Sequence, residues 1–398
     1  MTPTTDRADA LSTLLEITQI PTVAGREWRV IDWIARWAAA RPDLALAMDG
    51  AGNMTIGARE RWGGGGAPVL ITAHLDHPAF VVERVVAPSV VELAFRGGVR
   101  DPYFENARVV IHSGNGQRLL ATINPAGRAT PAGFNLYLAE LDAETPDEAG
   151  ISIRPGDIAV WDLPTGEVDA QGIVHTHACD DLSALAAALC AMDELRARRA
   201  AGAKLEDVRL LFTRSEEIGF PGALAACKLG TIPKGSRIIA LENSRSFSDS
   251  PLGAGPIVRV GDRMSIFDPA LTGACAKRAE DLVGRTTLAP FKYQRKLMAG
   301  GACEATVFCA YGHAATCICL PLGNYHNMAD LAEVESGAWN RAAKGPPRVG
   351  REYIHRDDYL NLIALLVAIG EQLPTAPAYL DRLENLYAKH KAVLDEGR

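Results

Sequence analysis

Two sequence textures follow one another along this chain, and their order limits the possible folds more than any other feature. In residues 1–80 and 173–398, short apolar runs alternate with segments that carry apolar residues at helical spacing. Between them, residues 81–172 hold short, β-branched runs separated by turn signals such as Pro155-Gly156-Asp157. The pattern predicts an α/β domain, with a mostly parallel sheet flanked by helices, interrupted by an inserted all-β, barrel-like domain.

Periodicity divides the α/β segments into elements. Apolar residues at helical spacing, such as Val30, Ile34 and Trp37, mark amphipathic helices, whereas compact apolar runs bounded by Gly and Pro mark buried strands. Strands and helices therefore alternate, as in a sheet that is covered on both faces. Strands are expected over residues 54–56, 68–73, 208–213, 237–241 and 316–320, and helices over residues 8–18, 27–40, 182–196, 222–227, 359–372 and 378–394.

Composition and charge exclude several classes of protein. The 398 residues are 48% hydrophobic and 22% charged, which is ordinary for a globular chain and long enough for two domains. A net charge of -7 gives no basic surface for phosphates, so nucleic acid is not an expected partner. The first residues are polar, and no apolar run reaches the ~18 residues of a membrane span. We therefore expect a cytoplasmic protein with no membrane partner.

The eight cysteines argue against a thiolate metal site. They lie in apolar segments without CxxC spacing, which indicates reduced, mostly buried thiols in a cytosolic protein. The sequence reveals no basic or helix-N-terminal setting for Cys179 or Cys303, which disfavours a cysteine nucleophile. Any metal ion would therefore be held by histidines and carboxylates.

Polar clusters lie at the ends of predicted strands and at the start of one predicted helix. In open α/β sheets, ligands bind in the crevice beyond the carboxyl ends of the strands, so these clusters are expected to converge there. The five clusters are His74 with Asp76 and His77, Glu216 with Glu217, Glu242 with Asn243, His326 with Asn324 and Asn327, and Asp180 with Asp181.

The residue types in these clusters fit a pair of divalent metal ions. Imidazole and carboxylate ligands suit zinc, cobalt or manganese, and two ions roughly 3.5–4 Å apart can polarise a carbonyl and acidify a shared water. Glu216 and Glu217 can take separate roles, one as a metal ligand and the other as the general base. Asp76 is close enough in sequence to hydrogen-bond the His74 ring and fix its tautomer.

Each of these residues also has a purely structural explanation. His74 alone fits a core histidine, Asp180 fits a helix N-cap, and Glu216 fits a solvated loop residue. His175 and His177 alternate as residues on a strand surface do, and this is favoured over a role as ligands. The metal hypothesis rests on the coincidence that five such clusters all fall at the ends of elements.

Taken together, these motifs resemble the TET-type aminopeptidases of metallopeptidase family 42, relatives of the glutamyl and deblocking aminopeptidases. The resemblance spans nearly the whole chain, and it implies a zinc-peptidase-like fold in which the β insert acts as a lid and oligomerisation domain. The matching segments are residues 20–25, 49–53, 73–76, 97–98, 109–111, 156–157, 178–181, 216–219, 222–223 and, more weakly, 300–304.

This resemblance implies a role for each residue of the clusters. Glu216 matches the general base and Asp76 matches the orienting aspartate, so both count as catalytic. The expected cofactor is two divalent metal ions per subunit. The implied ligands are His74 and Glu242 on one ion, Glu217 and His326 on the other, and Asp180 bridging both.

The same resemblance implies a metal-dependent aminopeptidase that removes N-terminal residues from short peptides. Glu216 would take a proton from water bridging the metal ions, the hydroxide would attack the peptide carbonyl, and Glu216 would then protonate the departing amine. The subunits would form a homo-oligomer, with a dodecamer enclosing interior chambers as the family's form.

Several positions depart from the family pattern and leave two alternatives open. One is a related deacylase, carboxypeptidase or dipeptide or amide hydrolase, and the other is a catalytically silent metal-binding assembly protein. The presence of both Glu216 and Glu217 favours an enzyme. The departures are His77 in place of Glu, Leu182 in place of Arg, Glu242 in place of Asp, Cys303 with Glu304 in place of Thr or Ser with Asp, and the segment from Asn324 to Asn327.

Overall fold

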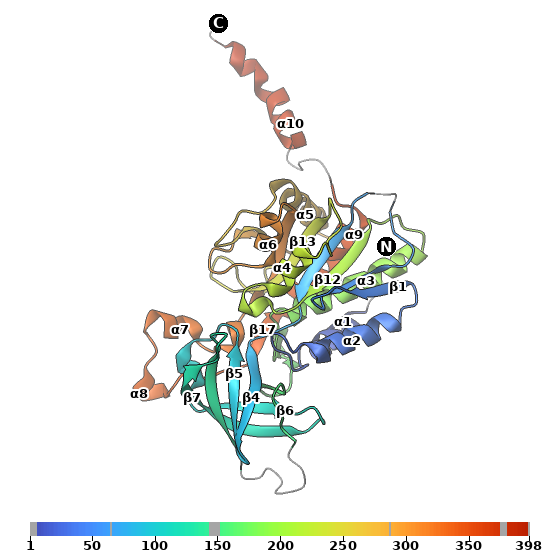
Figure 1. The fold of residues 1–398 in the computed structure, drawn as a ribbon. Helices are drawn as coiled ribbons and strands as arrows, with labels where there is room; N and C mark the ends of the chain where they lie inside the picture. The colour runs from blue at the N-terminus through green and yellow to red at the C-terminus, as the bar shows by residue number, and fades with distance from the viewer. Residues whose placement is uncertain (1–5, 64–65, 143–151, 286–287, 375–379, 397–398) are drawn as a thin grey trace.

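An eight-stranded mixed sheet forms the centre of the α/β body in the computed structural model (Figure 1). The strand order is β1-β2-β12-β3-β13-β16-β14-β15. The four central strands, β12, β3, β13 and β16, are parallel as predicted, whereas β1, β2 and β14 each have antiparallel neighbours. The strands are β1 (Leu44–Met48), β2 (Met54–Ala58), β3 (Val69–His74), β12 (Val208–Thr213), β13 (Arg237–Arg245), β14 (Ile257–Gly261), β15 (Gln294–Leu297) and β16 (Ala314–Leu322).

Helices cover both faces of this sheet. Successive residues of a strand point to opposite faces, so Ile71 and Leu210 pack under α1, α3 and α9, while Leu70 and Leu211 pack under α4 and α6. All six residues of β3 are buried, which is why this strand reads as one continuous apolar run. The helices are α1 (Arg7–Ile17), α2 (Trp28–Ala39), α3 (Leu182–Ala200), α4 (Pro221–Lys228), α5 (Pro269–Leu282), α6 (Glu304–Ala310), α7 (Leu331–Ser336), α8 (Arg341–Lys344), α9 (Arg356–Glu371) and α10 (Leu380–His390).

A closed antiparallel barrel follows β3 in the chain and lies below the α/β body in Figure 1. Five aromatic residues fill its interior, and most of their rings meet edge to face around Phe80. The barrel-like insert predicted from the sequence is therefore present as a six-stranded barrel. In barrel order the strands are β4 (Ala79–Ala87), β5 (Val90–Arg96), β8 (Asn135–Leu141), β7 (Arg118–Ala129), β6 (Ala107–His112) and β9 (Ile158–Trp161), and the aromatic residues are Phe80, Phe95, Phe104, Tyr137 and Trp161.

A small third sheet joins the barrel to the start of α3. It contains β10 (Glu167–Val168), β11 (Ile173–Thr176) and β17 (Glu352–His355), paired antiparallel in the order β10-β11-β17. This sheet brings Glu352 beside the segment that precedes α3. The division into an α/β domain, residues 1–80 and 173–398, and an insert, residues 81–172, stays a prediction.

The structure describes residues 6–63, 66–142, 152–285, 288–374 and 380–396. Within these ranges, no helix is long and apolar enough to cross a membrane. The predicted last helix is present as α10, which projects from the α/β body in Figure 1, and its expected start at Ala378 lies outside the described residues. β13 continues to Arg245, so Glu242 lies within the strand and not after it.

Candidate active site

The predicted cluster residues meet at one edge of the sheet. His74 ends β3, and Glu216 and Glu217 lie in the 3-10 turn η2 (Glu216–Ile218) that follows β12. Because the central strands are parallel neighbours, their carboxyl ends share this edge. Glu242 lies near the end of β13, His326 lies in the turn η3 (Tyr325–Asn327) after β16, and Asp180 precedes α3.

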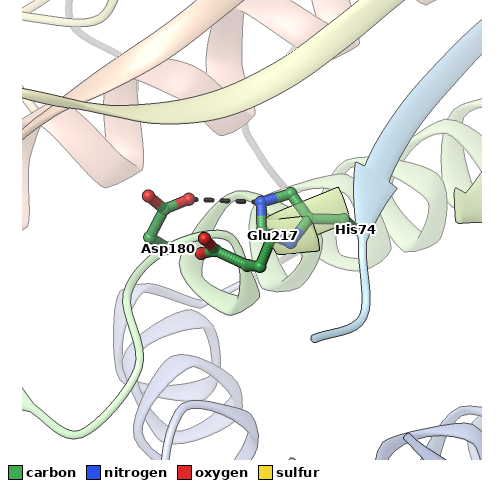
Figure 2. A group of neighbouring side chains, drawn as sticks. All are labelled: His74, Asp180 and Glu217. Carbon is green, nitrogen blue, oxygen red and sulfur yellow. Dashed lines mark ion pairs between the residues drawn. The ribbon is translucent and has the colours of Figure 1, made fainter. Parts of the chain in front are cut away.

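Asp180 lies between the two imidazoles. His74 Nε2 is 3.2 Å from Asp180 Oδ1, and His326 Nε2 is 3.6 Å from Asp180 Oδ2. Figure 2 shows the side chains of His74, Asp180 and Glu217 converging from three different elements. Glu217 Oε1 lies 3.4 Å from His326 Nε2, and Glu242 Oε1 lies 4.0 Å from His74 Nε2. Each imidazole therefore has one carboxylate of its own and shares Asp180 with the other.

Three buried atoms in this cluster lack a hydrogen-bond partner: His74 Nε2, Asp180 Oδ1 and Glu217 Oε1. The other ring nitrogen of His74, Nδ1, donates to the carbonyl of Asp76 at 3.1 Å, which leaves the Nε2 lone pair directed at a carboxylate oxygen. Lone pairs that face one another in the interior require a proton or a metal cation between them. Imidazole nitrogen and carboxylate oxygen atoms are the ligands that zinc, cobalt and manganese prefer, so these residues fit a metal site.

Two overlapping triads have ligand atoms close enough together to hold an ion. One contains His74, Asp180 and Glu217, and the other contains His74, Glu216 and Glu242, with all ligand atoms of a triad within 4.8 Å of one another. The triads divide the ligands differently from the ion pairs, which place Glu217 beside His326. In the division by ion pairs, each imidazole lies beside one carboxylate of its own, Glu242 for His74 and Glu217 for His326.

The carboxylates of the cluster crowd one another. Burial, followed by the charge of Asp180, raises the pKa of both Glu217 and Glu242 well above the usual value. Burial also raises the pKa of Glu216 well above its usual value. Burial acts to raise the pKa of Asp180, but the adjacent His326 and His74 imidazoles outweigh it and lower that pKa. The site therefore carries more buried carboxylates than its two imidazoles can neutralise, which favours binding of cations.

Asp76 ties the His74 strand to the turn that carries both glutamates. Its Oδ1 accepts a hydrogen bond from the Glu216 amide at 2.9 Å, and its Oδ2 accepts one from the Glu217 amide at 3.1 Å. Oδ1 also lies 3.5 Å from His74 Nδ1. Ser215, just before this turn, has a left-handed φ of 60°. Asp76 thus fixes the glutamate pair relative to the metal-facing histidine.

His326 is held by three contacts, two of which come from other parts of the chain. Its Nδ1 donates to the Gly98 carbonyl of the barrel segment at 2.6 Å, which leaves Nε2 free for a ligand. Its amide donates to Glu352 Oε1 at 2.8 Å, and the Tyr325 ring stacks on the imidazole with centroids 3.8 Å apart. His326 itself has a left-handed φ of 54°, which these contacts maintain.

Sequence reasoning missed Glu352, a fully buried carboxylate behind the cluster. Its Oε2 accepts hydrogen bonds from the Cys179 amide at 2.6 Å and the Asp180 amide at 3.1 Å, while Oε1 accepts the bond from His326. One side chain therefore fixes the backbone of both the shared carboxylate and the second imidazole. Glu352 begins a short strand far along the chain, and no local motif marks it.

The structural explanations considered for single residues fare differently. Asp181 occupies the N-cap position of α3, but its side chain makes no capping bond and instead accepts a hydrogen bond from the His74 amide at 3.4 Å. His175 lies 3.2 Å from Asp169 and His177 donates to the Pro164 carbonyl at 2.9 Å, so neither joins the cluster. His175 lies within β11, as the strand-surface interpretation requires, whereas His177 lies one residue beyond the end of that strand.

A family model for M42 glutamyl aminopeptidases matches residues 52–338. The chain belongs to this family. An aminopeptidase from the archaeon Desulfurococcus kamchatkensis is 22% identical, with a TM-score of 0.71 over 92% of this chain and 95% of that chain. The Pyrococcus horikoshii TET1 peptidase is 21% identical, with a TM-score of 0.68 over 92% of this chain and 100% of that chain. A further structure, PhTET1-12s, is 22% identical, with a TM-score of 0.68 over 91% of this chain and 99% of that chain. None of the curated proteins matches the chain.

The residues at which this M42 chain departs from the expected pattern lie close to the cluster. His77 Nδ1 donates to the Asp180 carbonyl at 2.6 Å, and its Nε2 lies 2.9 Å from Asn327 Oδ1. Leu182 is fully buried in the main core. Glu304 begins α6, and burial raises its pKa to about 7. These departures therefore change the supports around the cluster, while an imidazole or carboxylate stands at each predicted ligand position.

A cavity of about 420 Å³ opens beside the cluster in this M42 chain and is lined by Glu242, Tyr325, Arg259 and Gly98, among others. A larger cavity of about 970 Å³ lies elsewhere, between α1, α3 and the β1–β2 edge, and its lining includes none of the cluster residues. Of these two cavities, only the smaller one shares a wall with a predicted metal ligand.

Proposed function

We propose that this protein is a metal-dependent aminopeptidase that removes N-terminal residues from short peptides. The observation that carries the proposal is the convergence of two imidazoles and three carboxylates, with unpartnered atoms facing one another, next to a further free glutamate. Membership of the M42 family and the fold of the solved aminopeptidases support it.

The metal ligands follow from the ion-pair geometry. We infer that His74 and Glu242 hold one divalent ion, that His326 and Glu217 hold the other, and that the two oxygens of Asp180 serve both. Zinc, cobalt and manganese all suit this set of nitrogen and oxygen ligands. When bound, such ions polarise a carbonyl and acidify water.

Glu216 is the general base in this proposal. It is not needed as a ligand in the division above, and its backbone amide is fixed by Asp76 at 2.9 Å. Its carboxylate lies in the same triad as His74 and Glu242, so it can take a proton from water in the cluster and return it to the departing amine. Asp76 contributes by holding Glu216 and the His74 ring in fixed relative positions.

Glu216→Gln tests this assignment. The amide is nearly the same size but is a far weaker base, so kcat toward aminoacyl anilides should fall at least about 1000-fold. Metal content, measured by elemental analysis after reconstitution with zinc, cobalt or manganese, should stay as in the wild type. Glu140→Gln, an exposed change on the barrel, is the control and should leave both quantities unchanged. A fully active Glu216→Gln enzyme would sink the assignment.

We further propose that the chain forms a homo-oligomer. The solved TET1 peptidase of Pyrococcus horikoshii is described as assembling into a tetrahedron or a large octahedral shell, and PhTET1-12s is described as a dodecamer. This chain covers 99% or more of each of those chains, and the barrel expected to mediate assembly is present. The mass of the native protein in solution, measured by light scattering, distinguishes a dodecamer from smaller forms.

A further inference from the structure

The last helix, α10 (Leu380–His390), projects from the α/β body in Figure 1. All eleven of its residues are exposed, and so are those of the 3-10 turn η4 (Lys391–Asp395) that follows it. Among the described residues, none of α10 or η4 belongs to a hydrophobic cluster of the body or packs against one. An isolated helix of this length is marginal in water, so α10 lacks the packing that would stabilise it.

α10 and η4 present an apolar face to solvent. Six large apolar side chains of these two elements are 46% to 70% exposed. Within α10 they recur at intervals of three and four residues, which places them on one side of the helix, and Leu394 lies one heptad after Tyr387. An exposed apolar face of this kind marks an interaction surface. The six residues are Leu380, Leu383, Leu386, Tyr387, Val393 and Leu394.

The charged residues of this segment favour an antiparallel arrangement of two such helices. Asp381 and Glu384, with Arg382 between them, lie in the first half of α10. Lys389 lies in its last turn, and Lys391 directly follows the helix. Two parallel copies would bring like charges to the same level, whereas two antiparallel copies bring the acidic half of each beside the basic end of the other. The same order of charges also stabilises each single helix through its dipole, so the direction of pairing needs a test of its own.

A second copy of the chain fits this face better than a membrane surface or the same subunit does. Helices that lie on membranes carry mainly Lys and Arg on the polar side, whereas this segment also carries Asp381, Glu384 and Asp395. The same subunit is disfavoured because α10 points away from its own body in Figure 1. Identical chains most often associate about a two-fold axis, which presents the same surface on both sides and so covers one apolar face with its own counterpart.

We propose that α10 pairs antiparallel with α10 of a second copy of the chain, about a two-fold axis near Tyr387. In this pair the two apolar faces cover each other, and Glu384 of each copy lies near Lys391 of the other. The pair is short, so it reinforces an assembly that other contacts hold together, such as those expected of the barrel. This interaction goes beyond the proposed aminopeptidase function and does not depend on it.

Single cysteine substitutions read the geometry of this pair in the full-length protein. Tyr387→Cys places a thiol near the two-fold axis, so mild oxidation with copper phenanthroline should link at least about half of the chains as disulfide dimers. Leu380→Cys alone should stay unlinked, because its counterpart on the other copy lies roughly 20 Å away along the antiparallel helix. Co-expressed Leu380→Cys and Leu394→Cys subunits should link to each other, since these positions are equally far from Tyr387 in sequence.

Matched controls separate pairing from chance collisions. Asn385→Cys is also exposed but lies on the opposite, polar side of α10, so it should link no more than the wild type does. The wild type measures any contribution of the eight native cysteines, which are buried or half-buried. Leu383→Asp, added to Tyr387→Cys, should lower linking at least about tenfold, because it puts a charge into the apolar face. Circular dichroism and metal content show whether each variant folds.

Three results would overturn the inference. Linking of Leu380→Cys as strong as that of Tyr387→Cys would show a parallel pair, and equally strong linking of Asn385→Cys would show collisions alone. A Tyr387→Cys protein that links no more than the wild type would show that α10 does not pair with a second copy. Co-sedimentation of that protein with phosphatidylglycerol vesicles would then assign the face to a membrane surface. Turnover enters none of these readouts, so a failure of the proposed aminopeptidase function leaves the test intact.

Discussion

His74 and His326 approach the two oxygens of Asp180 from supports of different kinds. His74 ends a fully buried central strand, and its orienting partner, Asp76, lies two residues away. His326 lies in a turn with left-handed backbone and is oriented by Gly98 of the barrel segment and by Glu352 of a separate sheet. The first half of the site is therefore built by local sequence within the α/β body. The second half exists only when the barrel segment and the third sheet are in place.

Glu304, beside the His74 half, is expected to make the stability of the metal-free protein depend on pH. Glu304 is 3% exposed, its hydroxyl partner Thr213 is paired in register with His74, and burial raises its pKa from 4.5 to about 7. Between these two values the folded state holds a proton that the unfolded state has lost, so stability falls as pH rises through this window. In the metal-free protein this amounts to about 3 kcal/mol between pH 4.5 and pH 8.

Glu304→Gln should remove that slope. Urea unfolding in the presence of a chelator, at several values between pH 4.5 and pH 8, measures the free energy of unfolding of both proteins. The wild type should lose about 3 kcal/mol more than the variant across this range. Parallel curves for the two proteins would mean that the pKa of Glu304 is not raised in the folded protein.

Glu352→Gln tests the His326 half of the site. Both oxygens of Glu352 accept hydrogen bonds from backbone amides, those of Cys179, Asp180 and His326. Glutamine keeps one accepting oxygen, and its NH2 group would face a backbone N–H in place of the other. Loss of such an outer support typically costs 10- to 100-fold in metal affinity or activity. We expect about 30-fold weaker binding of the zinc ion near His326, measured by competition with a chelator, and a smaller change for the ion near His74.

Glu194→Gln is the matched control for that experiment. Glu194 is also a buried glutamate, 3% exposed, but it pairs with Arg198 on α3, away from the cluster. It should change stability and leave both zinc affinities as they are. Equal weakening of both ions in Glu352→Gln would show that the two halves share one support, contrary to the division between His74 and His326.

The two halves also differ in how far sequence could predict them. The His74 half is local: a histidine and an aspartate follow an apolar run, and Glu216 with Glu217 follows the neighbouring strand, so strand direction alone places them together. Glu352 lies 26 residues after His326 and 172 residues after Asp180, in a four-residue strand that periodicity did not mark. Its role depends on how the third sheet docks, and a single sequence carries no signal for that.

The same limit applies to the cavity wall. β14, which carries Arg259, and β15 were not predicted, because β14 is short and β15 is a half-exposed edge strand without a compact apolar run. The antiparallel entry of β14 next to β16 also explains why a mostly parallel sheet was expected and a mixed one is found. By contrast, the barrel insert was predictable, since its short β-branched runs and turns are properties of the local sequence.

The smallest expected effect concerns the contact between His326 and the segment after β5 that carries Gly97 and Gly98. Gly97 has a φ of 137°, and a Cβ there would lie 2.6 Å from Pro78 Cβ and 2.8 Å from Pro78 Cα, so Gly97→Ala must displace this segment. A Cβ on Gly98 would lie 3.6 Å from His326 Nδ1, an ordinary van der Waals contact. If the Gly98 carbonyl orients His326, then Gly97→Ala should lower kcat/KM about tenfold, mainly through loss of the ion near His326. Gly98→Ala should change kcat/KM less than about twofold. Restoration of Gly97→Ala activity by excess zinc would place the damage at the metal site, and equal effects of the two substitutions would show that the barrel does not orient this histidine.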